Sequence, residues 1–281
     1  MAKNIFLSTM VCGAILLFSC KSNHQASVAT SDSQPDSATL MDTAVIEDGG
    51  IRIFYNMYLS VEMSSLFKSI NATFSKKLLN NYEKANEYEI SGEKAVNLGV
   101  YAVDLSYCRA FDQIESAGNY LKAMHKLATE LGIPGDKFDL SVRRIEANVS
   151  NKDSLVKIAN ELYTATESYL KDSDRASAAA LVVLGGWTEA MYIATNMVNK
   201  KQKDIELLER IADQKTSLKN LMELLNKYKT DKKVQPYLEH LNKLSGPFNA
   251  FVIDENNMDS TYKQLGEVSS LIQMLRKEIV D

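Results

Sequence analysis

Helix-breaking residues are scarce in this chain, whose 281 residues include only four prolines and twelve glycines. From Ile51 onward apolar residues recur at spacings of three and four, as in Phe54, Tyr58 and Val61. This spacing places them on one face of an α-helix, and few breakers interrupt it. No stretch shows the sustained apolar–polar alternation of a half-buried β-strand. The pattern therefore predicts an all-α domain with no sheet.

Capping residues and glycine–proline stops divide this domain into predicted helices. Ser91 is suited to the N-cap of a long helix that runs to Leu131, where residues 132–135 form a strong stop signal. A helix from Val234 is expected to end before Ser245-Gly246-Pro247. The other predicted segments cover 51–70, 71–87, a short stretch from 139, about 150–170, 173–228 with a break near 199, and a last helix from 259. We expect a multi-helix bundle, or a short array of helix pairs, with about eight to ten helices in all.

The first twenty residues are typical of an export signal. Lys3 supplies a positive charge, and the almost unbroken apolar run from Ile5 to Phe18 is too short to span a bilayer. The run ends in Ser19 and Cys20 and is followed at once by polar residues. This junction resembles the lipobox of bacterial lipoproteins, in which the signal is cut before the cysteine and the cysteine is then acylated.

These features predict three regions: a signal peptide over 1–19, an acylated Cys20 with a flexible tether over 20–49, and a single all-helical domain over 50–281. The tether is rich in Ser, Thr, Ala and Asp, and this composition cannot bury enough apolar surface to order itself. Two or more acyl chains, which lipidated cysteines of this type carry, suffice for stable anchoring to a membrane. The acylated cysteine predicts a lipid-anchored position in the cell envelope, on the outer membrane. The absence of an acidic cluster after Cys20 favours a position facing the periplasm over display on the cell surface.

Net charge and motif content exclude several classes of function. The formal net charge is −4, and the lysines are scattered, so the chain lacks the basic footprint of a nucleic-acid-binding protein. None of His24, His125 and His240 has another histidine at metal-ligand spacing. No nucleophile elbow, phosphate loop or dinucleotide-binding turn is present. The sequence therefore predicts no catalytic residues, metal or cofactor, and a hydrolase assembled from scattered residues is the remaining enzymatic possibility.

Two segments, residues 98–101 and 184–187, share the order Leu, Gly, a small residue and an aromatic residue. Small residues beside a large ring let two helices approach closely, so these two helices are expected to pack at the centre of the domain. Residues 178–198 are apolar enough to span a membrane, but Glu189 in the middle of this run would be costly in lipid. We therefore expect a buried central helix.

Asp104 and Glu189 are carboxylates inside these apolar segments, where an unpaired charge is costly. Arg109 lies near Asp104 in sequence and is a candidate partner for either acid. One interpretation is a buried ligand site whose carboxylates bind a cation or an amine; the other is an ion pair that fixes the helix register. The candidate ligand-binding side chains are Tyr101, Asp104, Tyr107, Arg109, Trp187, Glu189 and Tyr192.

The lipobox-like junction, the string NLGVYAVDLSY at 97–107 and the string GGWTEAMY at 185–192 together resemble a family of uncharacterised all-helical lipoproteins of Gram-negative bacteria. The resemblance implies an envelope location and carries no activity. Two functions follow as expectations. The first is a non-enzymatic binding or scaffolding module that contacts another envelope protein. The alternative is a periplasmic small-ligand binder or sensor with a pocket around Tyr101, Asp104, Trp187 and Glu189.

Overall fold

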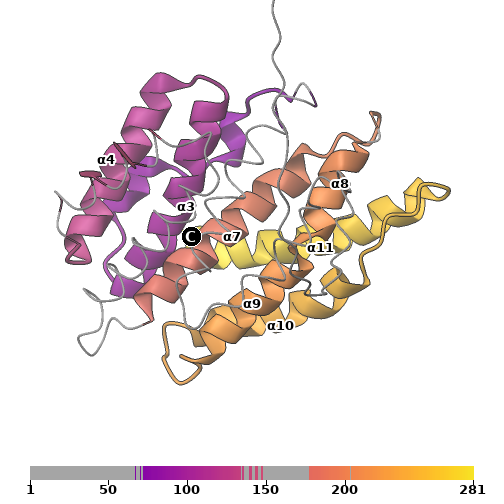
Figure 1. The fold of residues 1–281 in the computed structure, drawn as a ribbon. Coiled ribbons are helices and arrows are strands. Elements are labelled where there is room, and N and C mark those ends of the chain that lie inside the picture. Colours follow the sequence, from indigo (N-terminus) through magenta and orange to yellow (C-terminus); the bar gives the residue numbers. More distant parts are fainter. Residues whose placement is uncertain are drawn as a thin grey trace, which may run out of the picture. The chain divides into compact units, whose positions relative to one another are not determined.

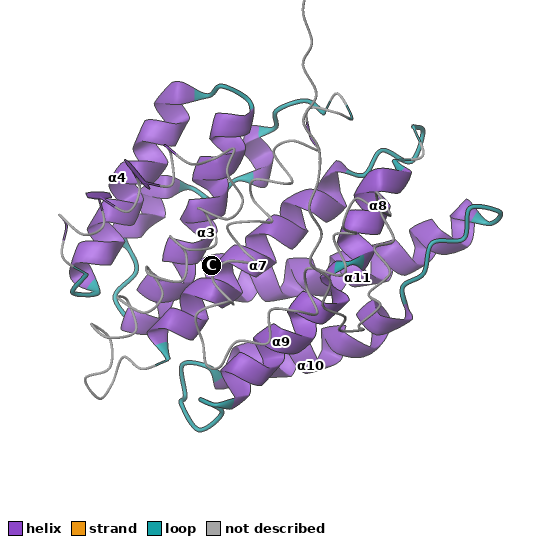
Figure 2. Ribbon diagram, in the orientation of Figure 1, coloured by secondary structure: helices purple, strands orange, loops and turns teal. Residues whose placement is uncertain are grey.

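A computed structural model describes residues 72–133, 177–202 and 204–281, together with Phe67, Ile70 and isolated positions between 135 and 147. The described residues belong to one unit of the chain, Ile46–Asp281. They form helices, turns and loops with no strand, which confirms the predicted fold class (Figure 2). The predicted signal peptide over 1–19, Cys20, the tether, the helix over 150–170 and nearly all of the helix over 51–70 lie outside the described residues.

Seven α-helices and two short 3-10 helices are present in the described part of the chain, against about eight to ten helices predicted for the whole. In chain order the elements are η1 (Lys76–Leu78), η2 (Tyr82–Asn86), α3 (Ser91–Ala110), α4 (Ile114–Glu130), α7 (Ala178–Met197), α8 (Ile205–Ala212), α9 (Gln214–Asn226), α10 (Gln235–Ala250) and α11 (Met258–Val280).

Helices α3 and α7 pack side by side, as the repeated glycine–aromatic pattern predicts (Figure 1). A Cβ atom on Gly99 would lie 2.0 Å from the carbonyl oxygen of Val182, and one on Gly185 would lie 1.8 Å from that of Val96. These distances are far inside van der Waals contact, so only glycine allows the two backbones to approach this closely.

The other helices surround this pair and bury α7. Helix α4 packs on α3, α11 packs on α7 and α10, and α9 packs on α10 and α7. Among the described helices, α7 alone is long and apolar enough to cross a membrane, and 89% of its most apolar window is buried in the protein. The prediction of a buried central helix is therefore confirmed for this segment.

The predicted helix over 91–131 is in fact two helices. The chain turns between α3 and α4 at Asp112, whose φ of 55° lies in the left-handed region. Aspartate tolerates this conformation better than most residues, so the turn has no glycine or proline to announce it. The predicted stop after Leu131 is confirmed, because α4 ends at Glu130 and Gly132 has a φ of 81°.

Two further boundaries differ from the prediction. The described part of the predicted helix over 71–87, residues 72–87, contains two short 3-10 helices instead of one α-helix. Helix α10 continues through Pro247 to Ala250 instead of ending before Ser245. Leu244 and Phe248 are fully buried, and their packing offsets the hydrogen bond that Pro247 cannot donate. The predicted break near residue 199 is confirmed, since α7 ends at Met197 and α8 begins at Ile205.

Candidate functional site

Residues 75–82, which we call the strap, contact α3, α4 and α7 and include η1 and the start of η2. Five backbone groups of the strap are hydrogen-bonded to side chains of the surrounding helices. Two backbone N–H groups donate: that of Ser75 to the Tyr107 hydroxyl (3.0 Å) and that of Asn80 to Asp104 Oδ2 (3.1 Å). Three backbone carbonyls accept: that of Leu78 from Arg276 Nη2 (3.2 Å), that of Asn80 from the Tyr120 hydroxyl (2.6 Å) and that of Asn81 from the Tyr101 hydroxyl (2.9 Å). Tertiary contacts thus supply hydrogen bonds that a regular helix would supply itself.

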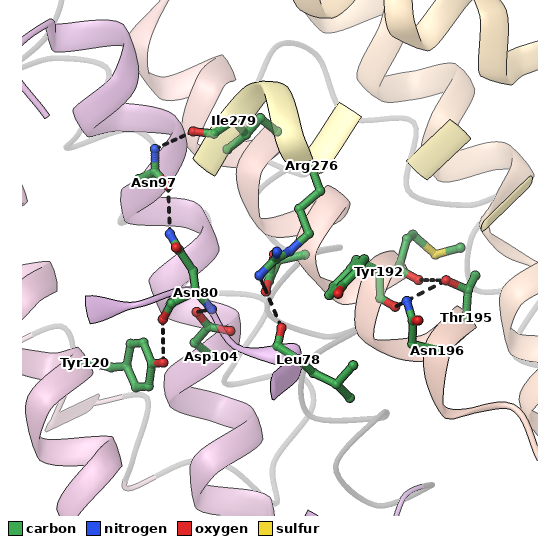
Figure 3. A network of polar contacts seen from close by, with 12 residues as sticks. Leu78, Asn80, Asn97, Asp104, Tyr120, Tyr192, Thr195, Asn196, Arg276 and Ile279 are labelled. Carbon is green, nitrogen blue, oxygen red and sulfur yellow. Dashed lines mark hydrogen bonds and ion pairs between the residues drawn. The ribbon is translucent and has the colours of Figure 1, made fainter. Parts of the chain in front are cut away.

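Asn80 lies at the centre of this network (Figure 3). Its side-chain amide donates to the Tyr88 hydroxyl at 3.1 Å and to Asn97 Oδ1 at 3.2 Å. The Asn97 amide in turn donates to the carbonyls of Glu93 (3.1 Å) and Ile279 (2.9 Å). Both asparagines are buried. The strap is therefore connected through Asn97 to the last turn of α11.

Glu189 of α7 forms a bidentate ion pair with Arg276 of α11. Arg276 Nε donates to Oε2 at 2.6 Å and Nη2 donates to Oε1 at 2.8 Å. The Glu189 side chain is fully buried, and that of Arg276 is 13% exposed. The guanidinium carbon lies 4.1 Å from the centre of the Tyr192 ring, a cation–π contact. Paired geometry of this kind is the strongest that arginine and a carboxylate can make.

Glu189 pairs with Arg276 and not with Arg109, the residue that the sequence predicts as a partner of Asp104 or Glu189. Arg109 is exposed, whereas both acids are fully buried. Arg276 is separated from Glu189 by 87 residues, so no local spacing could identify it. The interpretation of a register-fixing ion pair gains support from this contact.

Asp104 lies beside this ion pair and has a different environment. Its Oδ2 accepts the Asn80 N–H, two residues after the Leu78 carbonyl that binds Arg276, the partner of Glu189. Burial, and then the charge of Glu189, raise the pKa of Asp104 well above its usual range, while Arg276 opposes the shift. Burial also raises the pKa of Glu189, and the hydrogen bonds and charge of Arg276 act against that rise.

The hydroxyl and thiol groups around Asp104 are neutral at ordinary pH. Burial raises the pKa values of Tyr88, Tyr101 and Tyr120 above that of an exposed tyrosine. Burial also raises the pKa of the Cys108 thiol to about 12, so this cysteine is a protonated core residue. The charged groups that act on the pKa of Asp104 are therefore Glu189 and Arg276, and Lys76 of η1 acts on the neighbouring Cys108 thiol.

The seven candidate side chains divide into four groups. Tyr101, Asp104 and Tyr107 hold the strap; Glu189 and Tyr192 contact Arg276; Trp187 packs edge-on against Phe248 of α10; Arg109 is exposed. The Trp187 Nε1 is buried and has no hydrogen-bond partner among the described residues.

Sequence reasoning missed Asn80, Asn97, Tyr120 and Arg276. Of these, only Asn97 carries a usable local signal, because it is a polar residue inside the apolar stretch of α3. Within the described ranges, no three His, Cys, Asp or Glu side chains gather in a way that could hold a metal ion.

The chain matches no protein-family model, and no curated protein or solved structure is significantly similar to it. The resemblance to all-helical lipoproteins of Gram-negative bacteria accordingly stays a prediction from the quoted residues.

Proposed function

We propose that this protein is a lipid-anchored envelope lipoprotein whose helical domain is a non-enzymatic binding or scaffolding module for another envelope protein. The export signal and Cys20 support the lipid anchor. The absence of an acidic cluster after Cys20 supports an outer-membrane position that faces the periplasm. We favour scaffolding because the polar groups that a ligand site would need are already bound to other parts of the protein. Asp104 and Tyr101 bind the strap, and Glu189 binds Arg276.

The alternative is a periplasmic small-ligand binder or sensor. The buried Trp187 indole N–H, which finds no acceptor among the described residues, favours it. Against it, a ligand that reached Asp104 or Glu189 would have to displace the Asn80 N–H or the Arg276 guanidinium. Breaking such buried charge-assisted bonds costs about 3 kcal/mol or more, which the ligand would have to recover.

The anchor assignment predicts the behaviour of Cys20→Ala. Without the thiol, the precursor has no site for acylation, so metabolically incorporated labelled palmitate should be absent from the variant and present in the wild type. Cys108→Ala is the matched control, because the Cys108 thiol is buried in the folded domain. Palmitate label retained by Cys20→Ala would contradict the anchor.

Site-specific photo-crosslinking in the native envelope tests the scaffolding proposal. A photoreactive residue at Ile114, Val252 or Met274, large apolar side chains that are 84%, 56% and 55% exposed, should capture one envelope protein from at least one position. Exposed Lys122 and Glu267 provide control positions on α4 and α11.

Native mass spectrometry of the gently extracted protein tests the alternative, a small-ligand binder. A stoichiometric small-molecule adduct, with no protein captured at any position, would overturn the scaffold in favour of the ligand binder.

A further inference from the structure

Two buried carboxyl groups in the core share a single arginine. Asp104 and Glu189 are each fully buried, and both are connected to the same short part of the strap, Asp104 through the Asn80 N–H and Glu189 through Arg276 and the Leu78 carbonyl. The charge of Glu189 contributes to the raised pKa of Asp104. Among the described residues, the charged groups that face Asp104 are Glu189 from α7 and Arg276 from α11. Its other titratable neighbours are neutral: Tyr101 and Cys108 from α3, Tyr120 from α4, and Tyr88 from the segment before α3. With both acids ionised, this cluster would carry one uncompensated negative charge away from water, which is strongly unfavourable.

The hydrogen bonds indicate which of the two carboxyl groups carries a proton that would neutralise the extra charge. Both Glu189 oxygens accept from Arg276, so Glu189 is the ionised member of the pair. Asp104 Oδ2 accepts the Asn80 N–H, whereas Oδ1 is buried and receives no hydrogen bond from any described donor. A buried carboxyl oxygen that receives no donor is suited to carry a proton itself, because a protonated carboxyl group is a hydrogen-bond donor and needs only an acceptor such as a neighbouring carboxylate.

We propose that Asp104 is a neutral carboxylic acid in the folded protein, that it donates its proton to Glu189 in a hydrogen bond, and that this shared proton controls how firmly the strap is held. The cluster then contains one negative and one positive charge and is neutral overall. The same Asp104 carboxyl group binds the strap at Asn80, and the partner of Glu189 binds the strap at Leu78.

Loss of the proton would affect the strap before the helices. The ionised Asp104 would repel Glu189, and the repulsion is relieved only if the two carboxyl groups separate or water enters. The α3–α7 contact cannot widen easily, because the backbones meet at Gly99 and Gly185. The strap, in contrast, depends on tertiary hydrogen bonds from single side chains. Segments held in this way open locally at a lower free energy than helices do.

The proton itself can be detected by infrared spectroscopy. Wild-type protein at about pH 7, where exposed carboxyl groups are ionised, should show the carbonyl stretch of a protonated carboxylic acid. Asp104→Asn should lack this band, and Asp112→Asn, an exposed control in the α3–α4 turn, should keep it. The asparagine supplies an amide N–H to Glu189 and an oxygen to the Asn80 N–H, so the variant is expected to fold. A wild-type spectrum without the band would overturn the proposal.

Hydrogen exchange tests the effect on the strap. As pH rises through the disappearance of the band, exchange of the Asn80 amide, corrected for its intrinsic pH dependence, should rise by about tenfold or more in the wild type. In Asp104→Asn the corrected rate should change by less than about twofold, because no proton is lost there. Two results would overturn the control of the strap: equal pH dependence in both proteins, or a band that persists until the whole protein unfolds.

Discussion

Gly185→Ala is expected to lower the free energy of unfolding by about 3 to 5 kcal/mol, one of the largest effects available in this protein. The added methyl group would lie 1.8 Å from the Val96 carbonyl oxygen and 2.8 Å from its carbonyl carbon. Both atoms belong to the α3 backbone, so no side chain can rotate away. The helices must separate instead, and the side chains packed around the contact lose density. Urea unfolding followed by circular dichroism measures the change.

Gly118→Ala and Gly266→Ala are matched controls in α4 and α11. Both glycines are exposed, and a Cβ at either position would meet nothing within 4 Å. Alanine is favoured over glycine inside a helix, so each control should gain about 0.5 to 1 kcal/mol of stability. The same chemical change is thus expected to have opposite signs at the two kinds of site. A Gly185→Ala protein as stable as its controls would contradict the close approach of α3 and α7.

The contact between α3 and α7 could be predicted because its cause is local. A glycine beside a large aromatic residue in two apolar segments already indicates two helices that approach closely, and Gly99 and Gly185 lie at that contact. The same is true of the end of α4, where Gly132 adopts a positive φ. In both cases a short stretch of sequence contains all the residues that decide the geometry.

The strap could not be predicted, because its structure is decided from a distance. Phe74, Leu78 and Tyr82 have helical spacing, yet the backbone around them is bound by side chains that follow later in the chain. The partner of Glu189 was missed for the same reason, since Arg276 lies 87 residues away. Local context identified Asp104 and Glu189 as unusual, but it could not choose between a ligand site and an internal network.

Arg276→Met should reduce the free energy of unfolding by about 3 to 5 kcal/mol at neutral pH. The substitution keeps much of the side-chain volume and removes the only described cation paired with Glu189. Two buried carboxyl groups would then face each other without a positive charge, and the Leu78 carbonyl would lose its donor. Lys263→Met is the control on the same helix, because Lys263 is exposed and surface substitutions usually change stability by less than about 0.5 kcal/mol.

The loss in Arg276→Met should also depend on pH, and its direction identifies the cause. Without the arginine, the main influence that opposes the rise of the pKa of Glu189 and of Asp104 on burial is lost. An acid whose pKa is raised in the folded state stabilises fully below its unfolded pKa, about 4, and this stability is lost as pH rises through the folded-state pKa. The variant should therefore approach wild-type stability in mild acid and become progressively less stable than the wild type as pH increases.

Adding Glu189→Gln to Arg276→Met removes one buried acid, so the double variant should be more stable than Arg276→Met alone at neutral pH. Additive losses from the two substitutions would show that Glu189 and Arg276 do not act as a pair.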